Sequence, residues 1–209
     1  MARDFLLSAF VTLLVVVDPL SLAPMFVSLT SRATADVRRR IAVNACLIAA
    51  GILGGAAVVG DWVLKQLGIS LPAFRIAGGL LLFAVAFDMV LGWRSEREGK
   101  EAEQAAREEN VRHIAAFPLA IPLMAGPGAI TATLLLAGRA DGNAATVAML
   151  LGVIVAVMAV CFAAYSAADR IARLIGTMGN LVLSRLLGVV LAALAVQYVV
   201  DGVRATFAS

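Results

Sequence analysis

A carboxylate lies beside a proline inside the first apolar stretch of the chain. Asp18 is followed directly by Pro19, and Pro24 comes five residues later. Proline has no N–H and its ring clashes with the preceding turn, so each proline frees a carbonyl oxygen of a helix. An aspartate near the middle of a membrane span costs about 2.5–3.5 kcal/mol, and such residues mark ion or substrate pathways. We therefore predict helix breaks at Pro19 and Pro24, with Asp18 as the ion-coupling residue.

A second apolar stretch has a matching interruption, built from Pro122, Gly126, Pro127 and Gly128. The N-terminus of a half-helix offers N–H groups and the positive end of a dipole to a carboxylate. A single proline in a membrane helix is usually only a kink, which is the alternative for either break taken alone. Two matching breaks at mid-depth are instead the best sequence indication of a transporter binding site.

The composition places these breaks in a membrane. The chain has 209 residues, 62% of them apolar and 15% charged, with a mean hydropathy of +0.96. Soluble domains have about 45–50% apolar and 25% charged residues, so a soluble fold and a nucleic-acid binder are excluded. Six helices of about 20 residues would use nearly all of the apolar residues. The predicted spans are 5–30, 41–64, 72–92, 115–137, 144–167 and 182–204.

The basic residues predict the orientation. Twelve of the 17 Lys and Arg residues fall on one side of the predicted spans, which places that side in the cytoplasm. Both termini are then predicted to be periplasmic. The charged stretch 93–113 is predicted to be a cytoplasmic linker.

The chain contains two related halves. An offset of 108 residues aligns Pro19 with Pro127 and the pattern Asp61-x6-Gly68 with Asp169-x6-Gly176. Because each half has three spans, the second half enters the membrane from the opposite side. We predict an all-α membrane protein of two inverted three-helix repeats, 1–92 and 114–209, with interrupted helices 1 and 4.

Three further polar residues are candidates. At an offset of 110, Arg75 and Arg185 are equivalent and are predicted on opposite sides of the membrane. They either anchor the helices at the headgroups or act as gating residues through the nearby aspartates. Asn44 either lines the cavity or makes an interhelical hydrogen bond.

The sequence offers few residues that could form an enzyme active site. His113 is the only histidine and lies in the charged linker, so neither a buried Ser/His pair nor a histidine metal site can form in the membrane. Two functions compete with transport. One is a non-transporting structural or assembly protein, and the other is a dithiol redox carrier that uses Cys46 and Cys161.

The sequence resembles the MarC family of bacterial inner-membrane proteins, also described as a neutral amino acid transporter family. The likeness covers the whole chain and is carried by DPLSLAPMF at 18–26, PAFRIAGG at 72–79 and AIPLMAGPGAIT at 120–131. The resemblance implies six spans and ion-coupled movement of small neutral amino acids such as glycine and alanine.

These observations together predict a secondary transporter in the bacterial inner membrane, coupled to H⁺ or Na⁺. No enzyme activity, metal or cofactor is expected, and no nucleic-acid partner. The expected partners are a small solute and the lipid bilayer, with a homo-oligomer left open. The predicted substrate-binding residues are Ser21, Asn44, Gly126, Pro127, Gly128 and Thr131.

Overall fold

The computed structural model describes residues 2–31, 33–92, 115–139 and 143–207. The predicted linker 93–113 lies outside these ranges. The described residues form helices and no strands. The elements are α1 (Ala2–Val17), α2 (Pro19–Leu29), α3 (Ala35–Gln66), α4 (Leu71–Leu91), the π-helix η1 (Ala115–Met124), α7 (Pro127–Gly138), α8 (Ala144–Ser166) and α9 (Ala168–Phe207).

Five segments of the described chain are helical, long and apolar enough to cross a membrane. They are Ala2–Leu29, Ala35–Gln66, Leu71–Leu91, Ala144–Ser166 and Met178–Phe207. Large apolar side chains on their outer surfaces are exposed, among them Leu47, Trp62 and Val155. A helix that is apolar on all sides matches a lipid environment better than water. The predicted fourth span instead consists of two short helices, η1 and α7.

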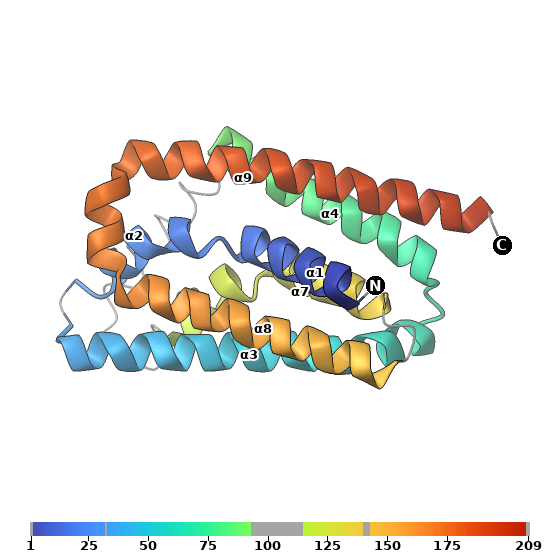
Figure 1. Cartoon of the computed structure of the whole chain (residues 1–209), viewed down its shortest axis with the longest axis horizontal. Helices are drawn as coiled ribbons and strands as arrows, with labels where there is room; N and C mark the ends of the chain where they lie inside the picture. The colour runs from blue at the N-terminus through green and yellow to red at the C-terminus, as the bar shows by residue number, and fades with distance from the viewer. Residues whose placement is uncertain (1, 32, 93–114, 140–142, 208–209) are drawn as a thin grey trace.

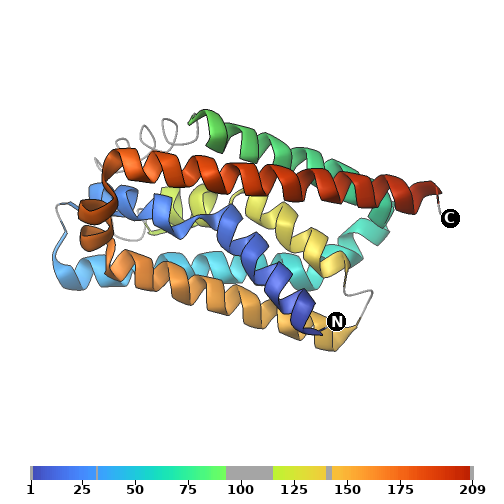
Figure 2. The same ribbon diagram turned by 45° about the horizontal axis from the view of Figure 1, so that its top comes forward.

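The helices pack in two outer pairs around an inner layer. Figures 1 and 2 show α4 alongside α9 on one side and α3 alongside α8 on the other. The interrupted segments α1–α2 and η1–α7 lie between these pairs. The first segment contacts α8 and α9, whereas α7 contacts α3 and α4. Both interrupted segments are therefore surrounded by continuous helices, which can shield broken backbone from lipid.

The two ends of the bundle are named for the residues that lie there. We call the end where α2 ends and α3 begins the basic end, because the start of α3 carries Arg38, Arg39 and Arg40, and the start of α9, which pairs with it through Asp169, carries Arg170 and Arg173. The other end is the terminal end, where α1 begins and α9 ends (Figure 1). Arg38–Arg40 lie inside α3, so this helix starts before the predicted apolar run at 41. Charged residues in a first turn can extend into water while the helix continues into lipid.

Glycine allows two turns that other residues resist. Gly68 follows α3 with a φ of 67°, and Gly176 has a φ of 62° and a ψ of 180° inside α9. Only glycine adopts such conformations at little cost. Gly176 bends α9, so the membrane-crossing part begins at Met178 and the preceding turns lie across the basic end (Figure 1).

Arg75 and Arg185 lie near opposite ends of α4. A methyl group added to Gly202 would lie 3.1 Å from Arg75 Cβ. One added to Gly92 would lie 3.9 Å from Arg185 Nη2. At the offset of 110, Gly92 is equivalent to Gly202 and Arg75 to Arg185, so the two contacts correspond to each other.

Candidate functional site

The first helix break is centred on Asp18. This residue has a φ of 52° and a ψ of 62°, and it is the only described residue other than glycine with a positive φ. It ends α1, because its N–H donates to Leu14 O at 2.9 Å while Pro19 opens α2. Proline is favoured at the first position of a helix, since its missing N–H would have no intrahelical partner there. The left-handed backbone of Asp18 costs about 1–3 kcal/mol and must be held by its surroundings.

The Asp18 side chain caps the helix that follows it. The residue is 1% exposed, and its Oδ1 accepts a hydrogen bond from Ser21 N at 3.3 Å. A carboxylate is stabilised at a helix N-terminus by the free N–H groups and the dipole. The break therefore holds a buried carboxylate at the start of α2.

The other predicted residues of this segment have separate roles. Ser21 Oγ is buried and has no hydrogen-bond partner among the described residues, so this hydroxyl can serve a ligand. Pro24 lies within α2, which continues through it to Leu29. The first break is thus located at Asp18–Pro19 and not at Pro24.

The second helix break has a different cap. The π-helix η1 ends at Met124, and Ala125 N donates to Ala120 O at 2.9 Å. Gly126 then adopts an extended conformation, with a φ of −70° and a ψ of 174°, and Pro127 opens α7. Pro122 lies within η1, so the interruption comes at Ala125–Gly126. Because Gly126 has no side chain, α7 begins without the side-chain cap that Asp18 gives α2.

The two breaks meet inside the bundle. A methyl group on Gly128 would lie 3.4 Å from Val16 Cγ1 and 3.2 Å from Val85 Cγ2. Val16 is two residues before Asp18, and Gly128 is in the first turn of α7. Thr131 is one turn further along α7 and is 6% exposed. The structure therefore brings the uncapped start of α7 close to the Asp18 break.

The remaining candidates lie outside this junction. Asn44 is half-buried in α3, and no hydrogen bond among the described residues joins it to either break. Two of the three aspartates considered as partners of Arg75 or Arg185, which are Asp61, Asp88 and Asp169, have other partners. Asp61 pairs with Lys65 at 2.6 Å within α3, and Asp169 pairs with Arg38.

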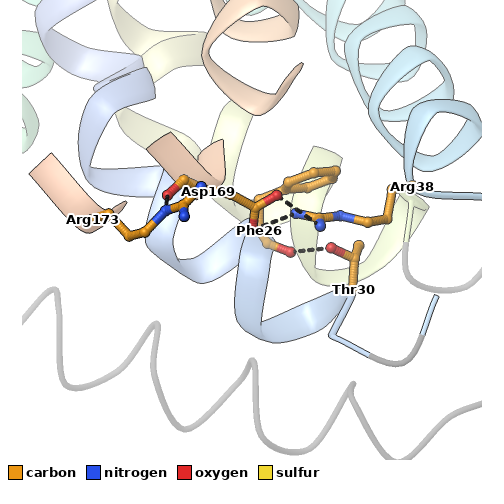
Figure 3. Close-up of polar contacts among 5 residues, drawn as sticks. All are labelled: Phe26, Thr30, Arg38, Asp169 and Arg173. Atoms are coloured by element: carbon orange, nitrogen blue, oxygen red, sulfur yellow. Dashed lines mark hydrogen bonds and ion pairs between the residues drawn. The ribbon is translucent and has the colours of Figure 1, made fainter. Parts of the chain in front are cut away.

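Sequence reasoning missed a cluster at the basic end, of which Figure 3 shows Phe26, Arg38 and Asp169. Arg38 of α3 donates two hydrogen bonds to Asp169 of α9, at 3.0 and 3.3 Å. The same guanidinium lies 5.7 Å from the ring centroid of Phe26, which stacks on Tyr165 with a centroid distance of 4.8 Å. These residues line a cavity of about 250 Å³. The one available signal in the sequence was that Asp61 and Lys65 of the first half align with Asp169 and Arg173 of the second.

A smaller polar group lies towards the terminal end. The Arg139 guanidinium stands over the Tyr198 ring, 5.0 Å from the ring centroid. Cys46 and Cys161 are both buried free thiols. Within the described ranges, no three His, Cys, Asp or Glu residues are grouped to hold a metal.

Comparison with known proteins identifies the family to which the chain belongs. The family model described as "MarC family integral membrane protein" matches residues 3–207. The chain belongs to the MarC family. The resemblance of the three motifs is thereby confirmed, and so is the status of an integral membrane protein.

MarC relatives occur in bacteria and archaea. A "UPF0056 membrane protein" of Aquifex aeolicus is 37% identical, over 94% of this chain and 91% of the relative. The Escherichia coli "UPF0056 membrane protein YhcE" is 34% identical, over 95% and 91%. A Methanocaldococcus jannaschii relative is 33% identical over 98% of both chains. These names state a membrane location and no substrate. No solved structure matches the chain.

Proposed function

We propose that this MarC protein is a secondary transporter of small neutral amino acids, driven by a gradient of H⁺ or Na⁺. The observation that carries the proposal is the close approach of Gly128, in the uncapped first turn of α7, to Val16, which is two residues before the buried Asp18. An inert helix bundle has no need for two broken helices that meet around an acid.

The substrate carboxylate binds at the start of α7. Gly128 and Ala129 have N–H groups in the first turn of this helix, and Gly126 supplies no side chain to cap them. In α2 the equivalent position is already occupied, because Ser21 N donates to Asp18. The predicted role of Gly126, Pro127 and Gly128 therefore stands as a proposal, whereas Ser21 contributes its hydroxyl rather than its N–H.

The dimensions of this junction favour a small substrate. Val16 and Val85 approach Gly128 so closely that even one added methyl group would touch both. Thr131 and Ser21 offer hydroxyl groups that can accept hydrogen bonds from a substrate ammonium group. A zwitterion with a short apolar side chain, such as glycine or alanine, matches these requirements.

Asp18 couples the solute to the driving ion. A buried carboxylate is costly in its charged form, so a proton or Na⁺ that neutralises it stabilises the site. The bound cation also strengthens the attraction of the site for a substrate carboxylate. The ion and the substrate then favour each other's binding, which is the requirement for coupled transport.

Two inverted repeats, 1–92 and 114–209, provide the alternating access. Several equivalent features support the repeat: Pro19 and Pro127 both open half-helices, and Gly68 and Gly176 both have positive φ. The contact of Gly202 with Arg75 is equivalent to that of Gly92 with Arg185, because each residue of one contact aligns with a residue of the other in the repeat. Rocking of one repeat against the other exposes the central site to each side in turn. The basic end is then cytoplasmic, and both termini face the periplasm.

Uptake of radiolabelled glycine and alanine into proteoliposomes tests this function. We expect accumulation when a pH or Na⁺ gradient is imposed and none when the gradient is collapsed. Asp18→Asn should remove the ion dependence, and Asp61→Asn, which changes an aspartate at the terminal end, serves as the matched control. Absence of gradient-driven flux for both amino acids would overturn the proposal and favour a structural or assembly role.

A further inference from the structure

Four residues of the basic-end cluster connect the two halves of the chain. Phe26 and Arg38 belong to the first half, and Tyr165 and Asp169 to the second. Each half contributes one aromatic ring and one charge. The rings of Phe26 and Tyr165 stack at a centroid distance of 4.8 Å with an interplanar angle of 20°. The charges of Arg38 and Asp169 form a bidentate ion pair (Figure 3). The contacts that hold this end together are thus contacts between the halves.

The cluster lies between the outer cavity and Asp18. Phe26 is eight residues after Asp18, about 12 Å along α2 at the rise of an α-helix. Tyr165 is one turn after the fully buried Cys161 in α8, and α8 packs against α2. Both aromatic residues are only 2% exposed, whereas the Asp169 side chain is 53% exposed towards the outside. A solute that entered the cavity of about 250 Å³ would therefore meet the aromatic stack before it reached Asp18.

Among the described residues, the positions equivalent to this cluster do not repeat its contacts at the terminal end. At the offset of 108, Phe26 corresponds to Leu134 and Arg38 to Thr146. Asp169 corresponds to Asp61, which pairs with Lys65 in its own helix instead of crossing to the other half. Leu134 lines an open apolar cavity of about 420 Å³ with Gly55, Gly60 and Val63. The contacts that these equivalent residues make between the two halves thus differ between the basic end and the terminal end.

We propose that Phe26, Arg38, Tyr165 and Asp169 form a gate that closes the basic end of the pathway and fixes the state seen here as closed on that side. The inference rests on the proposed function, since a gate requires a path past Asp18. Opening separates the Arg38–Asp169 ion pair and slides Phe26 from Tyr165. Because Asp169 is half-exposed, its ion pair is weak and water can replace it, as a gate that opens in each cycle requires.

Cys161 provides a reporter behind the gate that does not depend on transport. In a Cys46→Ala background, Cys161 is the only thiol of the chain. Its modification by a small membrane-impermeant methanethiosulfonate is measured from each side, in membrane vesicles of defined and opposite orientation. We expect slow modification of the parent from the basic side. Asp169→Asn and Arg38→Gln should each raise that rate about two- to fivefold, the change that an exposed ion pair corresponds to.

Two controls make the result decisive. The exchange Arg38→Asp with Asp169→Arg should return the rate towards the parent value, which also shows that the site still folds. Asp61→Asn, at the equivalent position of the first half, should leave it unchanged. Equal rates in Asp169→Asn and the parent, or an equal rise in Asp61→Asn, would overturn the gate. A protein that shows the expected rates but no amino acid flux would instead retain the gate and refute the proposed substrate.

Discussion

Gly128 of α7 packs against Val16 of α1, so the two interrupted segments touch beside their breaks. Each segment, taken alone, would need hydrogen-bond partners within the bundle for the backbone groups that its break leaves free. Placed together, they form one junction that contains the buried carboxylate of Asp18 and the uncapped first turn of α7. The absence of a side chain at Gly128 is what permits this approach.

Replacement of Gly128 by valine should destabilise the protein and abolish uptake. The first added methyl group would already lie 3.2 Å from Val85 and 3.4 Å from Val16. Further branching would overpack the junction, at a cost of about 1–3 kcal/mol. Gly152→Val in α8 is the matched control, because nothing lies within 4 Å of the position where a Cβ would be added. Thermal unfolding in detergent should show a lower midpoint for Gly128→Val than for Gly152→Val; equal midpoints would contradict the close contact.

Two substitutions of Asp18 should separate its structural role from its proposed coupling role. Asparagine tolerates the left-handed conformation and can still accept the hydrogen bond from Ser21 N, so Asp18→Asn should retain the fold. Asp18→Ala loses this cap, and we expect a loss of about 1–2 kcal/mol of stability. Both variants should lose ion-dependent uptake. Ion dependence that survives in Asp18→Asn would remove the carboxylate from the coupling mechanism.

The two glycines with positive φ that the repeat makes equivalent should respond alike to alanine. Gly68 and Gly176 have φ values of 67° and 62°, so a Cβ at either position introduces backbone strain of about 1–3 kcal/mol. Gly51→Ala is the control, because Gly51 is helical and has open space around it. Alanine there should leave stability unchanged or raise it slightly. A thermal midpoint that falls for Gly68→Ala and Gly176→Ala and not for Gly51→Ala is the expected result; no fall in either would argue against their shared role.

The sequence predicts the helix breaks because the relevant chemistry is local. Asp18–Pro19 and Gly126–Pro127 each combine a residue that can leave helical geometry with a proline suited to start the next helix. Pro24 and Pro122 follow Ala23 and Ile121 instead, and helices continue through both prolines. Whether a proline ends a helix depends on how its neighbours re-satisfy the freed carbonyl, and the neighbours come from other helices.

The basic-end cluster could not be predicted, because its contacts are distant in sequence. Arg38 and Asp169 are 131 residues apart and meet only after α3 and α9 pack at the same end of the bundle. Phe26 and Tyr165 resemble ordinary core residues until their rings are seen to stack. Likewise, the sequence offers Ser21 as a donor to a substrate carboxylate, whereas the folded backbone directs that N–H to Asp18.

Replacement of both cysteines should leave transport intact and thereby exclude a dithiol carrier. Cys46 is 8% exposed and Cys161 is fully buried, so both behave as small apolar residues that an exchanging thiol could not easily reach. Cys46→Ala with Cys161→Ala removes one sulfur atom at each site, and we expect only a small loss of stability with amino acid uptake close to that of the parent. Uptake in proteoliposomes, measured with and without a thiol reductant, checks this outcome. Loss of flux in the double variant, with a normal thermal midpoint and with reductant sensitivity in the parent, would favour redox chemistry at these thiols over the ion coupling assigned to Asp18.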